Sequence, residues 1–175
     1  MEQVLNVVDF DETLFRVPPF THAGTEFKKP YEWFDNPKSL NTNLYRLQLI
    51  ESVLAKLEDK DHTIILSHRV ESTRKAIEAV LDKFNITKKF NNIILCERAV
   101  EKPQVLLEYL EKVGPTFDKI RIFEDSLVQI NRYVNDPYLS KVTKSIEYWF
   151  VDKTELLQID GNIGILSRER IQLTY

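Results

Sequence analysis

The feature that most constrains the fold of this chain is the alternation of short apolar runs with longer segments of helical periodicity. The apolar runs are rich in β-branched residues, as buried strands are, and occupy residues 3–10, 62–67, 91–96 and 119–125. Between them, apolar residues recur at helical spacing over residues 44–57, 71–84 and 102–114. Strands that alternate with helices are typical of a parallel sheet with helices on its faces. The sequence therefore predicts an α/β fold, a Rossmann-like three-layer sandwich around a central parallel sheet.

The ends of two predicted helices carry recognisable signals. Pro103 lies in the first turn of the third helix and Gly114 follows its last apolar residue, which is the usual arrangement. Ser72 is a suitable N-cap for the second helix. The remaining predicted elements are a short helix at 126–134 and strands at 145–152 and 162–166.

Composition places the chain among ordinary globular proteins. It has 175 residues, which suits one domain, and 43% of them are hydrophobic, which is enough for a core. Its net charge of −3 excludes a broadly basic protein that coats nucleic acid, although a local basic patch stays compatible with it. We expect a single domain over residues 1–175.

Cysteine usage and hydropathy predict a soluble protein of the cytoplasm. The one cysteine, Cys96, lies in an apolar run, where a small buried hydrophobe is expected rather than a nucleophile. A single cysteine forms no intrachain disulfide, as is usual in a reducing compartment. The first residues lack the basic region of a signal peptide. No apolar run approaches the ~18 residues that span a bilayer, so we expect no membrane segment.

Residues 15–43 interrupt the alternation of strands and helices. This segment holds four of the seven prolines and six aromatic residues. A connection of this length between a strand and a helix is unusual in a compact domain and is often functional. Two interpretations stay open, an aromatic-rich surface loop folded back on the core, and a flap that contacts the substrate.

Polar residues stand at or near the carboxyl end of each of the first four predicted strands. In chain order they are Asp9 with Asp11, Ser67, Lys102, and Glu124 with Asp125. Because ligands of parallel sheets bind at the carboxyl ends of the strands, we expect these side chains to form one site. The carboxylates suit a hard divalent cation such as Mg²⁺, and the hydroxyl and the lysine suit an anion that the cation also touches. A phosphoryl group satisfies both halves of such a site.

Asp9 and Asp11 are separated by one residue. In extended backbone, residues two apart face the same side, so both carboxylates reach the same space. Like charges this close are unfavourable unless a cation or a reacting group lies between them. The alternative is that both are solvated acids of a loop or a helix cap.

The sequence "DFDET" at residues 9–13 resembles the D-x-D-x-T signature of the haloacid dehalogenase (HAD) superfamily. The later pieces follow in that family's order: Ser67 ends an apolar strand, Lys102 opens a helix, and Glu124 with Asp125 ends the next strand. The resemblance covers roughly residues 4–135. It implies a HAD-like fold without a large cap domain, with residues 15–43 as a small insertion beside the site. It also implies a Mg²⁺-dependent phosphatase, that is, a hydrolase of phosphate monoesters.

The resemblance implies a role for each matched residue. Asp9 would be the nucleophile that forms an aspartyl-phosphate, and Asp11 would be the general acid for the leaving group and then the base for water. The metal would bind the side chains of Asp9 and Asp125 and the backbone carbonyl of Asp11. The phosphate-binding residues that it implies are Thr13, Ser67 and Lys102.

Four residues keep an alternative role. Glu124 is either a metal ligand or a neighbour of the ligands. Arg69 either grips a phosphate of the substrate or pairs with an acid of the following helix, such as Glu71. Ser67 and Lys102, each taken alone, also fit an ordinary turn hydroxyl and an ordinary surface lysine.

A narrower resemblance involves four stretches, "FDETLFRVPP", "EWFDNPKSL", "LSHR" and "FED". Together they look like the phosphatase-type domain of the Swiss Army Knife RNA-repair proteins. This likeness implies a nucleic-acid end, such as a 3′-phosphate, as the phosphorylated substrate. Aromatic residues such as Trp33 would then stack on bases, and cations such as Arg16 would meet the backbone.

Other functions fit the same residues. Within the phosphatase class, the substrate is alternatively a phosphoprotein or a nucleotide. A non-catalytic binding module is the alternative outside it, because no second acid follows Asp125 four or five residues on. A phosphotransferase would use the same aspartate, whereas Asp11 argues against dehalogenation.

Overall fold

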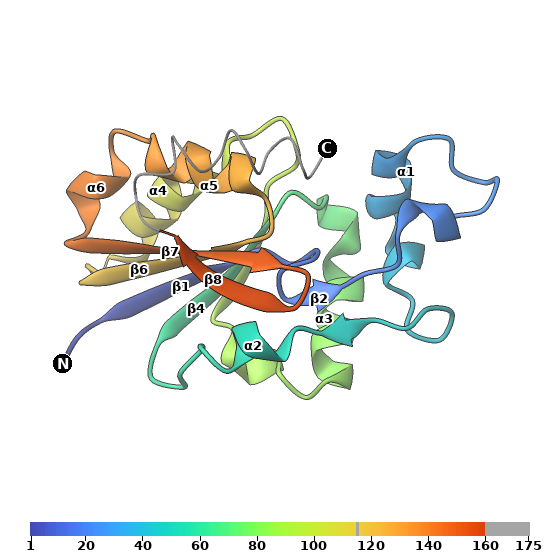
Figure 1. Cartoon of the computed structure of the whole chain (residues 1–175), viewed down its shortest axis with the longest axis horizontal. Helices are drawn as coiled ribbons and strands as arrows, with labels where there is room; N and C mark the ends of the chain where they lie inside the picture. The colour runs from blue at the N-terminus through green and yellow to red at the C-terminus, as the bar shows by residue number, and fades with distance from the viewer. Residues whose placement is uncertain (115, 160–175) are drawn as a thin grey trace.

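Six strands form one sheet, five of them parallel, with helices on both faces (Figure 1). The computed structural model describes residues 1–114 and 116–159. Within this sheet, as far as it is described, only β8 runs antiparallel, and it pairs with β7 in a hairpin. This arrangement confirms the predicted α/β, Rossmann-like fold with a mostly parallel central sheet. In sheet order the strands are β5 (Asn92–Leu95), β4 (His62–Ser67), β1 (Val4–Val8), β6 (Lys119–Glu124), β7 (Ser145–Asp152) and β8 (Glu155–Ile159).

The two faces of the sheet are covered by different helices (Figure 1). One face carries α4 (Lys102–Val113), α5 (Leu127–Val134) and α6 (Leu139–Val142). The other carries α2 (Glu51–Leu54) and α3 (Arg74–Lys83). Successive side chains of a strand point to opposite faces, so Val7 of β1 joins the first hydrophobic cluster and Val8 the second. Burial on both sides explains why these strands are continuously apolar in sequence.

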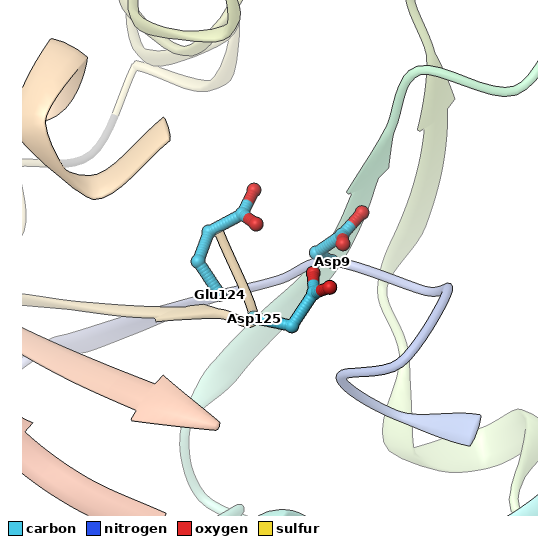
Figure 2. A group of neighbouring side chains, drawn as sticks. All are labelled: Asp9, Glu124 and Asp125. Carbon is cyan, nitrogen blue, oxygen red and sulfur yellow. The ribbon is translucent and has the colours of Figure 1, made fainter. Parts of the chain in front are cut away.

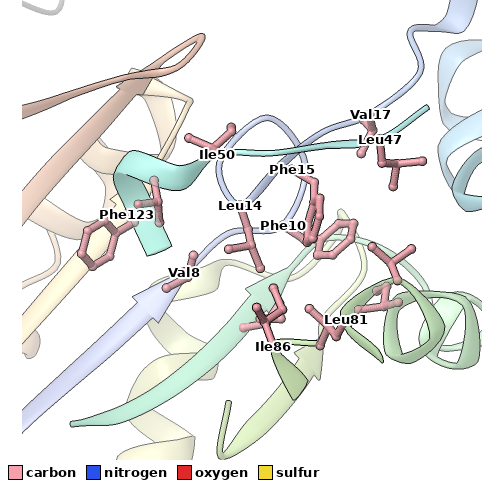
Figure 3. Close-up of a cluster of buried hydrophobic side chains, with 14 of the residues drawn as sticks. Val8, Phe10, Leu14, Phe15, Val17, Leu47, Ile50, Leu81, Ile86 and Phe123 are labelled. Atoms are coloured by element: carbon pink, nitrogen blue, oxygen red, sulfur yellow. The ribbon is translucent and has the colours of Figure 1, made fainter. Parts of the chain in front are cut away.

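The second cluster extends past the end of β1 into the loop that holds the two aspartates. Figure 3 shows Phe10, Leu14 and Phe15 in this cluster together with Leu81 and Ile86. Phe10 follows Asp9 directly, and its carbonyl accepts hydrogen bonds from the backbone N–H groups of Leu14 and Phe15, both at 3.1 Å. The apolar residues around the aspartates therefore anchor the loop and fix the direction in which the acids leave the sheet.

The prediction of a helix over 44–57 is wrong for most of its length. Only α2 is helical there, and β3 (Gln48–Leu49) pairs antiparallel with β2 (Phe15–Arg16). The backbone N–H of Ile50 also donates to the carbonyl of Leu14 at 2.9 Å. These hydrogen bonds to the loop after β1 hold residues 48–50 extended, so tertiary pairing overrides the helical spacing of the apolar residues.

Most other predicted elements are confirmed. Pro103 lies in the first turn of α4, and Gly114 ends it with a φ of +77°, the left-handed region that glycine favours. The N-cap assigned to Ser72 is wrong, because a 3-10 turn, η3 (Glu71–Thr73), precedes α3 and no side chain caps it. The predicted strand at 162–166 lies outside the described residues, and β8 was not predicted.

Residues 15–43 lie beyond the carboxyl ends of β1 and β4 (Figure 1). They contain β2, η1 (Phe20–His22), α1 (Pro30–Phe34) and η2 (Pro37–Leu40). Trp33 is fully buried, donates from Nε1 to the carbonyl of Pro18 at 3.0 Å, and packs edge-on against Phe27 and Tyr45. The segment therefore has a small aromatic core, which Tyr45, just beyond the segment, completes.

The described part of the chain contains no larger insertion that forms a cap domain. None of its helices is long and apolar enough to cross a membrane.

Candidate active site

Three carboxylates converge where β1 and β6 end side by side. Val8 of β1 is paired with Phe123 of β6, and the backbone N–H of Asp9 donates to the carbonyl of Phe123 at 3.1 Å. Asp9 therefore emerges beside Glu124 and Asp125. Figure 2 shows the three side chains gathered at this edge, and one oxygen of each lies within 4.8 Å of the others.

Lys102, the first residue of α4, is the cation closest to these acids. Its side chain is 2% exposed, and its Nζ lies 3.0 Å from Oδ1 of Asp9 and also contacts Oε1 of Glu124. Burial favours the neutral amine, but the two carboxylates outweigh it and hold the pKa of Lys102 well above its ordinary value. A lysine opening the helix was predicted from sequence, and its burial excludes the alternative of an ordinary surface lysine.

The acids of the cluster are not fully compensated by Lys102. Burial, followed by the charge of Asp9, raises the pKa of Glu124 to about 8, against the opposing effect of Lys102. Burial and the charges of Asp9 and Glu124 also raise the pKa of Asp125 well above its usual range. Oε2 of Glu124 is buried without a hydrogen-bond partner among the described residues. A set of oxygen donors with excess negative charge fits a hard divalent cation such as Mg²⁺.

Asp11 does not join this cluster with its side chain. Both of its carboxylate oxygens are bound by the guanidinium of Arg69, Oδ2 by Nε at 2.8 Å and Oδ1 by Nη2 at 2.6 Å. Arg69 is 2% exposed, whereas the side chain of Asp11 is 26% exposed. The alternative partner considered for Arg69, Glu71, pairs with Arg74 instead. Of the two roles left open for Glu124, its place in the cluster favours that of a metal ligand. The side chain of Asp11 lies outside the cluster, where the resemblance implies a metal contact only for its backbone carbonyl.

Two predicted phosphate-binding hydroxyls occupy different positions. Ser67 lines the cavity at the end of β4, and its Oγ accepts a hydrogen bond from the backbone N–H of Arg69 at 3.1 Å. Thr13 is fully buried and does not line the cavity. Its hydroxyl lies 3.4 Å from Oδ2 of Asp9 and 3.3 Å from Oδ1 of Asp125. Thr13 therefore contacts the carboxylates, in keeping with the further role that the resemblance implies for it, which is to help place Asp9.

The cluster faces a cavity of about 440 Å³. Its polar wall includes Ser67, Lys102 and the acids, and its apolar wall comes from the 15–43 segment. The apolar wall consists of Val17, Pro19, Phe20 and Phe34. Residues 15–43 thus form part of the cavity, as the flap interpretation requires.

Two predicted substrate contacts are placed elsewhere. Trp33 is buried in the aromatic core of the segment, so its ring is not available to stack on a base. Arg16 does not line the cavity and pairs with Glu12, with 3.4 Å between Nε and Oε2. Sequence reasoning missed Phe20 and Arg98, which do line it. No local pattern marks either residue, because each reaches the site only through the packing of the loop that carries it.

Comparison with known proteins identifies the fold. No family model matches the sequence, and no curated protein matches it. Among solved structures, the HAD domain of the effector protein Lem4 from Legionella pneumophila superposes with a TM-score of 0.52 at 17% identity. The match covers 98% of this chain and 94% of that chain. At this identity the likeness shows a common fold, so the described residues have a HAD-like architecture.

Proposed function

We propose that this protein is a HAD-type phosphatase that depends on Mg²⁺ and hydrolyses a phosphate monoester through an aspartyl-phosphate on Asp9. The observation that carries the proposal is the set of contacts of Asp9. Its carboxylate lies 3.0 Å from Lys102, within 4.8 Å of the oxygens of Glu124 and Asp125, and on the wall of a cavity. A carboxylate with an adjacent cation and a clustered acidic site is the arrangement that nucleophilic phosphoryl transfer needs.

The acidic cluster fits the metal that this chemistry uses. Asp9 and Asp125 would hold Mg²⁺ through their side chains and Asp11 through its backbone carbonyl, with Glu124 as a further donor. When bound, Mg²⁺ supplies positive charge that offsets the phosphoryl oxygens and the carboxylates.

The protein's own residues account for both halves of the reaction. In the first, an oxygen of Asp9 attacks phosphorus and the bond from phosphorus to the ester oxygen breaks, while Asp11, as the general acid, gives a proton to that oxygen. In the second, Asp11 takes a proton from water, the water oxygen attacks phosphorus, and the bond to Asp9 breaks to release inorganic phosphate. Lys102 and Ser67 donate hydrogen bonds to the phosphoryl oxygens throughout.

The nucleophile is tested with p-nitrophenyl phosphate and Mg²⁺. Asp9→Asn keeps the shape of the side chain and removes the nucleophile, so kcat should fall by about 10³-fold or more. Asp59→Asn changes an aspartate that is 89% exposed and pairs with Lys89. It is the matched control and should keep wild-type kcat. Turnover by Asp9→Asn close to that of the control would overturn the covalent mechanism.

Within this class, we propose the 3′-phosphorylated end of a nucleic acid as the substrate. Support comes from the absence of a cap domain in the described residues and from the flat rings of Phe20 and Phe34 on the cavity wall. Rates with a 3′-phosphorylated oligonucleotide, a phosphopeptide and a mononucleotide test this choice, and the oligonucleotide should have the highest kcat/KM. A higher kcat/KM for either competitor would assign the site to that substrate.

A phosphate-binding module without turnover is the second candidate. The observation that favours it is the occupation of both Asp11 oxygens by Arg69. It predicts binding of phosphorylated ligands with no hydrolysis in the presence of Mg²⁺.

A further inference from the structure

Arg69 contacts two parts of the molecule that are far apart in the sequence. Its Nε and Nη2 bind the carboxylate of Asp11, and its Nη1 binds the carbonyl of Phe34 at 2.5 Å and Oγ of Ser39 at 2.9 Å. The guanidinium also lies over the ring of Phe34, 5.8 Å from its centroid. A single buried side chain therefore holds the carboxylate and residues 34–39 at the same time.

Burial makes the two sets of contacts depend on each other. Arg69 is 2% exposed, so its charge is offset by the carboxylate of Asp11 rather than by water. Its Nη1 hydrogens have the acceptors of Phe34 and Ser39 in place of water. Loss of either set leaves a buried donor or a buried charge unpaired, which weakens the other set.

A second arginine holds the same segment without touching Asp11. Arg98, in the loop after β5, places Nη1 2.8 Å from each carboxylate oxygen of Asp35. Its side chain is 45% exposed. Arg98 therefore provides a comparison in which the attachment of the segment is altered and the contacts of Asp11 are kept.

We propose that Arg69 is a positioning residue that couples the docking of residues 34–39 to the placement of the Asp11 carboxylate. Asp11 reaches its position on the cavity wall only while this segment is docked. Docking of the cavity wall that carries Phe34 thus also places Asp11, the acid–base group. The coupling itself is a property of the fold, and its catalytic consequence rests on the proposed function.

The coupling is tested without any activity, by hydrogen–deuterium exchange of the amides of residues 34–41. Asp11→Asn should accelerate this exchange by about tenfold, although no hydrogen bond joins Asp11 to the segment. Arg69→Gln should accelerate it at least as much. Glu71→Gln, which alters a neighbouring acid that pairs with Arg74, should leave it unchanged. Exchange in Asp11→Asn equal to that in Glu71→Gln would overturn the proposal.

The catalytic consequence is tested with two phosphate esters, one with a good leaving group and one with a poor one. Only the poor leaving group needs the proton of Asp11, so Arg69→Lys should lower kcat on it about tenfold more than kcat on the good one. Arg98→Ala should lower kcat on both by a common factor. If Arg69→Lys also lowers kcat equally on both esters, Arg69 has a structural role only.

Two further controls separate the possible failures. If circular dichroism shows that Arg69→Lys is unfolded, Ser39→Ala is measured instead, because it removes one acceptor of the same guanidinium and should show a smaller effect of the same sign. Absence of turnover in the wild-type protein would refute the proposed function. In that case the exchange experiment alone decides the coupling.

Discussion

Two buried cations, Lys102 and Arg69, divide the acids of the site between them. Lys102 contacts Asp9 and Glu124, and Arg69 holds Asp11. Under the proposed function, this division separates the carboxylate that would attack phosphorus from the one that would exchange protons with the substrate. At the residue scale, the two aspartates of the D-x-D pattern therefore have different electrostatic surroundings despite being two positions apart.

The contribution of Lys102 to the site is measured by Lys102→Met. This change leaves the buried carboxylates of Asp9 and Glu124 without their cation, so the free energy of unfolding in EDTA should fall by about 3 kcal/mol. Mg²⁺ should restore part of that loss, because it replaces the missing positive charge. Urea unfolding with and without Mg²⁺ checks both, with exposed Lys60→Met as control. A Lys102→Met protein as stable as this control would show that the buried pair contributes nothing.

At the scale of elements, the strands were predictable and the connections were only partly so. Buried parallel strands leave a continuous apolar signal, which is why β4 and β7 have the bounds expected for them. β8 was missed because its turn contains Lys153 at a φ of +59° instead of the glycine or asparagine that marks such hairpins. Residues 44–57 were assigned to a helix because spacing alone does not reveal the hydrogen bonds that β2 offers to β3.

Some residues of the candidate site were predictable from local sequence pattern, and others depend on long-range packing. Asp9, Ser67, Lys102 and Asp125 stand at strand ends or at a helix start, so topology brings them together and the sequence pattern is sufficient. The partner of Arg69 depends on how residues 15–43 fold over the strands. The sequence near Arg69 carries no sign of that packing. Sequence alone therefore suggests the nearby Glu71, and not Asp11, as the ion-pair partner of Arg69.

Because residues 44–50 are not helical, Leu44 and Leu47 should contribute differently to stability. Leu44 and Leu47 would share one face of a helix, but Leu44 is 59% exposed and Leu47 is buried. Leu47→Ala should lower the free energy of unfolding by about 2 to 4 kcal/mol, and Leu44→Ala should change it by less than about 0.5 kcal/mol. Urea denaturation of the two variants measures the difference. Equal losses in both would favour the helix that the periodicity suggested.

At the scale of the whole molecule, the sheet gathers charge at one edge that the fold does not fully neutralise. The chain carries a net charge of −3, and three carboxylates lie together at the carboxyl ends of β1 and β6. Two of them, Glu124 and Asp125, have raised pKa values. Stability is therefore expected to depend on pH and on the metal together.

In EDTA, the free energy of unfolding should decrease as pH rises from about 7 to about 8.5. The pKa of Glu124 is raised to about 8, so the folded state binds its proton more tightly than the unfolded state and loses that advantage as pH rises through this range. His62 and His68 have pKa values that burial lowers, so the unfolded state binds their protons more tightly and any slope that they add has the opposite sign. Urea unfolding across this range measures the slope. Glu124→Gln should reduce it, and the raised pKa of Asp125 adds a slope of the same sign. A slope unchanged by Glu124→Gln would assign it to another group.

The aromatic core of residues 15–43 gives the protein an optical signal of its own. The chain has two tryptophans, Trp33 inside that core and Trp149 on β7. Replacing Trp149 with phenylalanine leaves one indole, whose surroundings change from protein to water only when the segment around it opens. Fluorescence of this single indole would then follow the opening and closing of the cavity wall in real time, without a label and without a substrate.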